Sequence, residues 1–227
     1  MTDFLQAGTA MLLVAILGTA AEALRRRDGA AAVNSLVVVA VSLSPFAVEA
    51  VSAPSVTVGP ELTVWLATAG FLHMVGMLGV YETVWWWDHV THTVSAALVA
   101  ALWYAGMAVV ASPSGSLLAA ATVGFVLAAG VCWELVELVA RALGRRFDVE
   151  PVLVHYGWRD TAFDLVFDVV GAALVVALDL RLFASLAEQS PDVTAAVLAW
   201  SAGVVVAGSL VMAVALTLAD AWPAWEG

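Results

Sequence analysis

The 227-residue chain contains no lysine, only one cysteine and few charged residues of any kind. Without lysine there is no amine that could form a Schiff base with retinal, so a retinal protein is excluded. The one cysteine, Cys132, lies inside an apolar segment and excludes an intrachain disulfide. All eight positive charges are arginines, against nineteen Asp and Glu. This acidic, lysine-free usage resembles that of halophilic archaeal proteins, and we expect no nucleic-acid partner.

Apolar residues dominate what is present. They make up 63% of the chain, charged residues make up 12%, and the mean hydropathy is +0.98. Such a composition indicates a polytopic membrane protein whose principal partner is the lipid bilayer. The sequence predicts an all-α bundle of seven transmembrane helices forming one domain over residues 1–227. The expected segments are residues 4–24, 30–51, 61–81, 89–111, 116–140, 160–182 and 194–219.

The arginines predict the orientation. Arg25, Arg26 and Arg27 follow the first segment, and Arg141, Arg145 and Arg146 follow the fifth. Only Arg181 falls on the other side of the predicted membrane. By the positive-inside rule, the N-terminus lies outside and the C-terminus in the cytoplasm of a cell with this protein in its plasma membrane. The first segment reads as a retained anchor, because its charges follow it.

Three aspartates recur every fourth residue at the start of the sixth segment, at Asp160, Asp164 and Asp168. On a helix this spacing places them on one face, each about 6 Å further along the axis. A carboxylate near a helix N-terminus is favoured by the helix dipole, which accounts for Asp160. It does not account for Asp168, two turns deeper, where an ionised carboxylate needs a proton, a cation or a base.

Two more polar pairs occur in apolar segments. Asp88 and His92 lie four residues apart at the start of the fourth segment, and Glu134 and Glu137 lie near the end of the fifth. In the first pair, the carboxylate can hold the imidazole in one tautomer or join it as a ligand, and a helix-capping Asp beside an interfacial His is the alternative. An ion pair with Arg141 explains Glu137. Neither account covers Glu134. A lone His73 in the third segment is interpreted as a packing residue.

These motifs fall at one depth. Counting about 1.5 Å per residue from each predicted boundary places them roughly 5 to 13 Å below the cytoplasmic surface. Several acids would lie there beside only one imidazole, so bound cations or shared protons would reduce the repulsion between the carboxylates. Oxygen ligands with one nitrogen suit Mg²⁺, Mn²⁺, Fe or Zn²⁺. The sequence therefore predicts a divalent-metal site formed by Asp88, His92, Glu134, Asp164 and Asp168.

The fourth and sixth segments also share a pattern. Asp88-x-x-x-His92 and Asp164-x-x-x-Asp168 are each followed, after three residues, by Ala-Ala-Leu-Val-x-Ala-Leu. The three motifs together resemble those of the VanZ-like and YjdF-like membrane proteins, whose activity is largely undefined. The resemblance implies a shared site at Asp88, His92, Glu134, Asp164 and Gly171. The VanZ-like pattern usually has Gln at the place of Glu137 and Asn at that of Asp168. We therefore do not infer VanZ-type glycopeptide resistance for this chain.

Three functions remain open on these residues. The first is a metal-dependent enzyme that hydrolyses or transfers a phosphate or ester group on a lipid or lipid-linked substrate. In it Asp160 or Glu137 would act as base, and Arg159 would lie near an anionic head group. The second is a cation- or proton-coupled transporter, and the third is a non-catalytic protein with a structural ion. Haem held by His73 and His92 is disfavoured because their estimated depths differ by about 6 Å.

Overall fold

The computed structural model describes residues 2–52, 56–154 and 156–221, and in this part of the chain all regular secondary structure is helical, without strands. The all-α class predicted from the sequence is thus confirmed. The elements are α1 (Thr2–Arg26), α2 (Gly29–Ser52), α3 (Pro60–Val75), the π-helical segment η1 (Gly76–Val80), α4 (Tyr81–Thr83), α5 (Trp87–Val110), α6 (Gly115–Phe147), α7 (Trp158–Ala177), α8 (Ala184–Gln189) and α9 (Pro191–Ala221).

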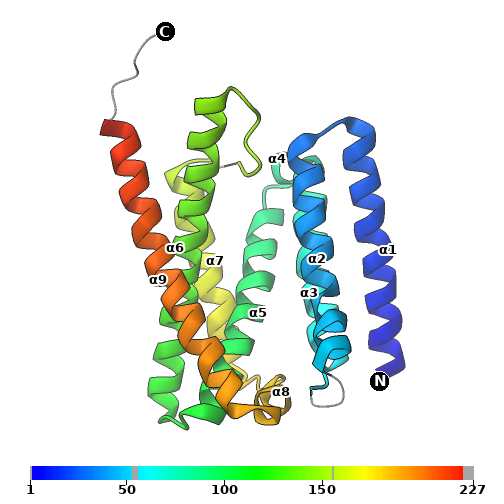
Figure 1. Cartoon of the computed structure of the whole chain (residues 1–227), viewed down its shortest axis with the longest axis vertical. Coiled ribbons are helices and arrows are strands. Elements are labelled where there is room, and N and C mark those ends of the chain that lie inside the picture. Colours follow the sequence, from blue (N-terminus) through cyan, green and yellow to red (C-terminus); the bar gives the residue numbers. More distant parts are fainter. Residues whose placement is uncertain (1, 53–55, 155, 222–227) are drawn as a thin grey trace.

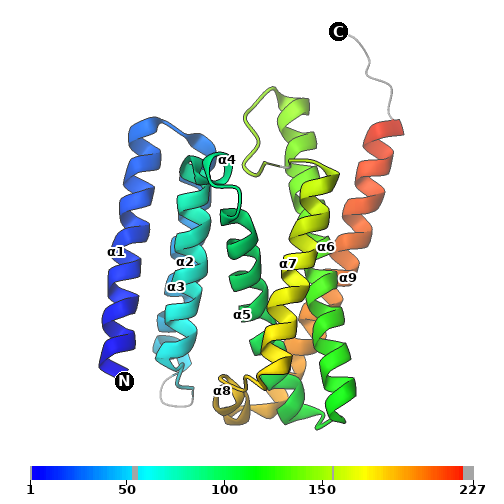
Figure 2. The ribbon, with the colours of Figure 1, turned by 180° about the vertical axis from the view of Figure 1, so that it is seen from behind.

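Among the described residues, six helical stretches are long and apolar enough to cross a membrane: Asp3–Arg26, Gly29–Ser52, Pro60–Thr83, Trp87–Val110, Gly115–Phe147 and Pro191–Leu218. Seven had been expected. The expected segment at 160–182 forms α7, which is not among the six because its first half carries Arg159 and three aspartates. The count of seven is therefore not confirmed, although α7 lies alongside α5 and α6 (Figure 2).

The long helices run roughly parallel to one axis of the molecule (Figure 1). Helices α1, α2 and α3 pack on one another, while α5 packs on α6, α7 and α9, and α3 contacts α5. Large apolar side chains are exposed on the outside, among them Phe4, Met11, Trp200 and Val211. In a soluble protein such faces would be unusual, whereas a bilayer covers them.

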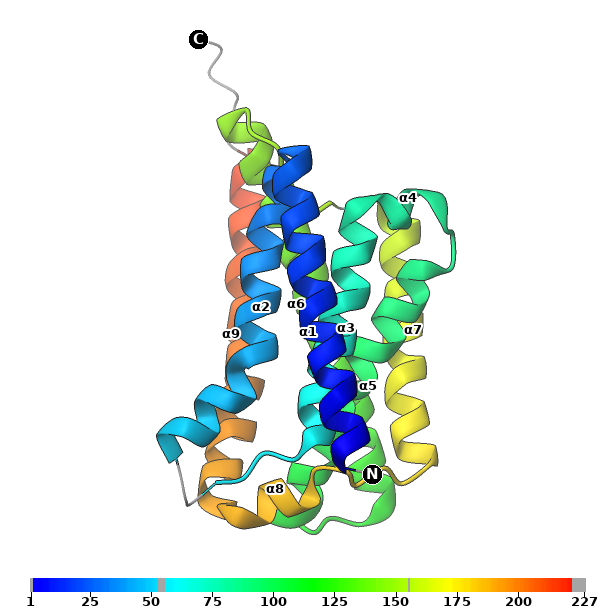
Figure 3. The ribbon, with the colours of Figure 1, turned by 90° about the vertical axis from the view of Figure 1, so that its right-hand side faces the viewer.

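The arginine-bearing ends of α1 and α6 lie at the same end of the bundle as α4 (Figure 1). The N-terminal end of α1 lies at the opposite end, where α8 also lies (Figure 3). Helix α6 continues to Phe147, seven residues beyond the predicted end, and stops where Asp148 takes a left-handed conformation with φ of 53°. The connection to α7 is consequently shorter than predicted, residues 148–157.

Small residues hold the centre of the bundle together. The buried face of α5 is largely alanine, including Ala97, Ala100, Ala101 and Ala105. Gly171 of α7 lies against it so closely that a Cβ atom there would come within 2.5 Å of the Thr93 carbonyl oxygen and 2.9 Å of the Ala97 nitrogen. The backbones of α5 and α7 can approach this far only because no side chain intervenes. This packing positions the polar residues one to two turns above.

Candidate functional site

The shared pattern of α5 and α7 corresponds to two helices that lie side by side. Both begin at the end of the bundle that carries α4 and run in the same direction (Figure 2). The Thr93 hydroxyl reaches across to the Phe167 carbonyl oxygen at 3.4 Å. With this register, beside the contact, His92 of α5 faces Asp164 and Asp168 of α7.

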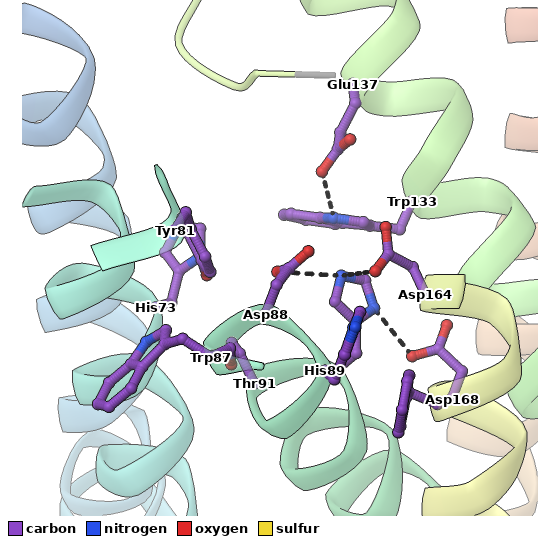
Figure 4. A network of polar contacts seen from close by, with 12 residues as sticks. His73, Tyr81, Trp87, Asp88, His89, Thr91, Trp133, Glu137, Asp164 and Asp168 are labelled. Atoms are coloured by element: carbon purple, nitrogen blue, oxygen red, sulfur yellow. Dashed lines mark hydrogen bonds and ion pairs between the residues drawn. The ribbon is translucent and has the colours of Figure 1, made fainter. Parts of the chain in front are cut away.

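Three carboxylates surround the His92 imidazole (Figure 4). The Nε2 atom lies 3.8 Å from Asp88 Oδ1 and 3.7 Å from Asp164 Oδ1. The Nδ1 atom lies 3.1 Å from Asp168 Oδ1. Only the contact at Nδ1 is short enough for a hydrogen bond, so Nδ1 carries a proton and donates it to Asp168. The Nε2 atom faces the other two acids.

Asp164 is the most deeply buried of these acids, with 2% of its surface exposed. Its Oδ1 atom is buried and accepts no hydrogen bond from any described residue. Such an atom is rare, because an unpaired buried polar group costs about 1–3 kcal/mol. The ligand atoms of Asp88, His92 and Asp164 all lie within 4.8 Å of one another. The arrangement has the residue types and spacing of a cation site.

Asp168 occupies a different place from Asp164. It hydrogen-bonds Nδ1, on the far side of the ring from Asp88 and Asp164. Its carboxylate fits against α6 where Gly130 has no side chain, since a Cβ atom at Gly130 would overlap the Asp168 oxygen Oδ2. A carboxylate that accepts from the second nitrogen of a metal-binding histidine orients the ring and fixes its tautomer.

The remaining predicted site residues are less closely grouped. Glu134 is buried and accepts a 2.6 Å hydrogen bond from the Thr161 hydroxyl. Glu137 accepts one of 3.0 Å from Trp133 Nε1. Asp160 lines the cavity described below. Arg159 is exposed, with its guanidinium 5.6 Å from the centre of the Trp158 ring, and is not among the residues that line the cavity.

His73, interpreted from the sequence as a packing residue, belongs to a polar network on the opposite side of Asp88 (Figure 4). Its Nδ1 lies 3.2 Å from the Tyr81 hydroxyl and its Nε2 3.2 Å from Asn34 Oδ1. Both ring nitrogens are therefore occupied, which leaves neither for haem. No local sequence pattern indicated this network, because Asn34 precedes His73 by 39 residues.

A cavity of about 470 Å³ separates these two networks. Its upper wall is polar and includes Tyr81, Asp88, His92, Glu137 and Tyr156. The connection 148–157 borders this end: Asn34 Nδ2 donates to the Val152 carbonyl oxygen at 2.6 Å, and the Tyr156 hydroxyl donates to Glu82 at 2.8 Å. Partial burial, and then this bond to Glu82, raises the pKa of Tyr156 above its usual range, so the phenol stays a donor.

Along α5 the cavity extends from Asp88 down to Val99, about 16 Å at 1.5 Å per residue. The lower part is lined by apolar side chains of four helices, among them Val38, Val41, Leu66, Val99 and Val126, with the buried Ser42 hydroxyl between them. The volume lies within the range of small-molecule sites. The cavity therefore has a polar end with acids and an apolar end inside the bundle.

These features define a helical, multi-pass membrane protein with a buried His/carboxylate cluster that faces an amphipathic cavity. Its family is shown by sequence comparison. The chain belongs to the family described as "Predicted membrane protein (DUF2238)", whose model matches residues 7–185 of the 227. The matched region contains α3 to α7 and hence every residue of the candidate site. No curated protein and no solved structure matches the chain.

Proposed function

We propose that Asp88, His92 and Asp164 bind a divalent cation, and that this site hydrolyses or transfers a group on a lipid or lipid-linked substrate held in the adjoining cavity. The observation that carries the proposal is the buried Oδ1 atom of Asp164. It receives no hydrogen bond from the described residues, yet lies 3.7 Å from His92 Nε2. A cation between them would satisfy both atoms.

The distances favour a cation over a shared proton. Two ligand atoms that each lie about 2.1 Å from one ion are at most about 4.2 Å apart. The separations of 3.7 and 3.8 Å from Nε2 to the two carboxylates lie within that limit. A proton on Nε2 would form no hydrogen bond across either distance. With Nδ1 donating to Asp168, a neutral His92 directs the lone pair of Nε2 toward the two acids, as a metal-binding imidazole does.

Two carboxylates and one imidazole suit Mg²⁺, Mn²⁺, Fe or Zn²⁺. Asp168 is proposed to act on the site through His92, by the hydrogen bond to Nδ1. Glu134 is proposed to support the same region of α6 and α7 through Thr161. In this assignment the five predicted metal residues divide into three ligands and two positioning residues.

A bound divalent cation supplies a Lewis acid and lowers the pKa of a coordinated water. The residues that line the cavity supply the proton acceptors and the surface that holds the substrate. Asp160 and Glu137 both border it and are the candidates to accept a proton from the attacking water or hydroxyl group. Arg159, exposed beside Trp158, is proposed to contact anionic head groups at the membrane surface. The apolar lower end of the cavity holds the hydrocarbon part of the substrate.

Two further inferences, one on the relationship to other families and one on the number of membrane crossings, belong to this proposal. We infer that the family shares its site with the VanZ-like and YjdF-like proteins, because Asp88, His92, Glu134, Asp164 and Gly171 all lie at or beside the cluster. We also infer that α7 is the seventh crossing. Its 20 residues span about 30 Å, and its aspartates face the bundle interior rather than lipid.

Coupled transport is a weaker alternative, since the cavity ends at Val99, near the middle of α5.

Metal titration tests the proposal. With Mn²⁺ followed by electron paramagnetic resonance, the wild-type protein is expected to bind one ion, and His92→Gln to lose binding. Asp168→Asn is expected to bind about tenfold more weakly, because the ring loses its charged partner. His89→Gln is the matched control, since the His89 ring stacks on Phe167 with ring centres 4.3 Å apart and is not one of the three proposed ligands. Absence of a stoichiometric ion in the wild-type protein contradicts the metal site.

The proposed orientation has its own test. In a background lacking Cys132, a cysteine at position 145 is expected to react with an impermeant maleimide only after the cytoplasmic side is opened. A cysteine at position 181 should react in intact cells, because α7 and α8 meet at the opposite end of the bundle (Figure 1). Labelling of position 145 from outside intact cells would reverse the orientation and place the cluster near the outer leaflet.

A further inference from the structure

The wall that faces the cluster is built by an irregular stretch of backbone. After α3, the π-helical segment Gly76–Val80 includes Gly79, whose φ of 110° is accessible mainly to glycine. The Tyr81 ring then folds back over Gly76, where a Cβ atom would overlap the ring carbons. The two glycines and the kink at Gly79 thus direct the Tyr81 hydroxyl toward His73.

The hydrogen bonds behind Tyr81 fix the direction of its proton. Asn34 Nδ2 donates to the carbonyl oxygens of Ala30 at 2.9 Å and Val152 at 2.6 Å, so its two hydrogens are used. Asn34 Oδ1 must then accept from His73 Nε2. Neither partner of His73 is a carboxylate, which favours an uncharged ring whose Nδ1 is an acceptor. The Tyr81 hydroxyl therefore donates to His73 and leaves its oxygen lone pairs for a ligand in the cavity.

The charges of the cavity select against an anion. Four carboxylates line it, from Asp88, Glu137, Asp160 and Asp168, and none of the described lining residues is a lysine or an arginine. Asp164 adds a fifth at the cluster. Each ionised carboxylate that the divalent cation does not offset repels a phosphate head group. A neutral head group with hydroxyls meets acceptors instead: the Tyr81 oxygen and the carboxylates.

We propose that the cavity binds an amphiphile with an uncharged, hydroxyl-bearing head group. One hydroxyl donates to Tyr81 opposite the His92 cluster, and the hydrocarbon chain extends down toward Val99 and Val126. This inference rests on the proposed function and narrows its substrate class. The reacting group becomes an ester or glycosyl group on a neutral lipid, in preference to a phosphate. Tyr81 acts as the specificity-determining residue.

The test compares ligands of equal chain length on the full protein in phosphatidylcholine nanodiscs loaded with Mn²⁺. The probes are 1-O-dodecylglycerol, its dimethyl ether, and dodecyl phosphate, and native mass spectrometry measures the fraction of protein that carries each. Dodecylglycerol is expected to bind at one per protein, about tenfold more tightly than dodecyl phosphate. This first comparison uses only wild-type protein, so it does not depend on the folding of any variant.

The Tyr81→Phe variant isolates the hydroxyl. It is expected to bind dodecylglycerol about tenfold more weakly, the usual size of one hydrogen bond to a buried acceptor, and to bind the dimethyl ether as well as the wild type does. Because the ether has no hydroxyl to donate, this double comparison separates the contact from a general effect on structure. Tyr104→Phe is the matched control: its hydroxyl donates to Asp179 and does not line the cavity.

Two outcomes overturn the inference: dodecyl phosphate binding as tightly as dodecylglycerol, or Tyr81→Phe retaining wild-type affinity for it. Metal content measured on the same samples distinguishes failure of the substrate inference from failure of the proposed metal site. If the ion is bound but phosphate is preferred, the metal site stands and the neutral substrate class is wrong. If no ion is retained while dodecylglycerol still binds through Tyr81, the cavity assignment stands and the metal-dependent function is wrong.

Discussion

Asp164→Asn is expected to lower the metal content of the purified protein at least tenfold and to abolish the effect of chelators on its melting temperature. Asparagine keeps the size of the side chain but removes the charge that holds a cation. A ligand present at 100 times its dissociation constant stabilises the folded state by about 2.7 kcal/mol, so the wild type should melt several degrees lower once the ion is removed. Melting curves with and without EDTA, together with elemental analysis, measure both effects.

Asp148→Asn provides the control for Asp164→Asn. It removes the same charge from an exposed residue at the end of α6, in a left-handed conformation that asparagine also adopts readily. Its metal content and melting should match the wild type. If the wild type is insensitive to chelators and Asp164→Asn is more stable than the wild type, then the acids are held by protons and repel one another, and the metal site is wrong.

Gly171→Ala is expected to destabilise the protein by about 1–3 kcal/mol, the usual cost of inserting a methyl group into a packed interface. The added carbon would meet backbone atoms of α5, at 2.5 Å from the Thr93 oxygen and 2.9 Å from the Ala97 nitrogen, and backbone cannot rotate away as a side chain can. Because α5 carries His92 and α7 carries Asp164, separation of the helices should also weaken metal binding. Thermal melting and Mn²⁺ titration of one preparation report the two effects.

The matched control is Gly203→Ala on α9, where a Cβ atom meets nothing within 4 Å. There the change should leave metal binding unaltered and keep or slightly raise stability, since alanine favours a helix more than glycine does. Equal stability of Gly171→Ala and Gly203→Ala would show that α5 and α7 are not held at the distance described, and the positions of Asp164 and Asp168 around His92 would need revision.

Local sequence patterns predicted where the long helices lie but not the role of each helix in the fold. Long runs of apolar residues predicted each of the six helical stretches that, within the described residues, are long and apolar enough to cross a membrane. The prediction of a seventh was weakened by the same aspartates that drew attention to α7. The irregular turn before Tyr81 was not anticipated. Gly76 leaves room for the Tyr81 ring and Gly79 supplies a positive φ, and no local sequence pattern indicates either role.

From the sequence alone it follows that Asp160, Asp164 and Asp168 share a face of one helix, because the α-helix has a period of 3.6 residues. The sequence also establishes that too few bases are present to neutralise these acids. What each acid contacts depends on the fold: Asp164 faces Nε2 of His92, Asp168 binds Nδ1, and Glu134 binds Thr161. The strength of a hydrogen bond changes over tenths of an ångström, and the packing of Gly171 on α5, which helical periodicity does not specify, sets these distances.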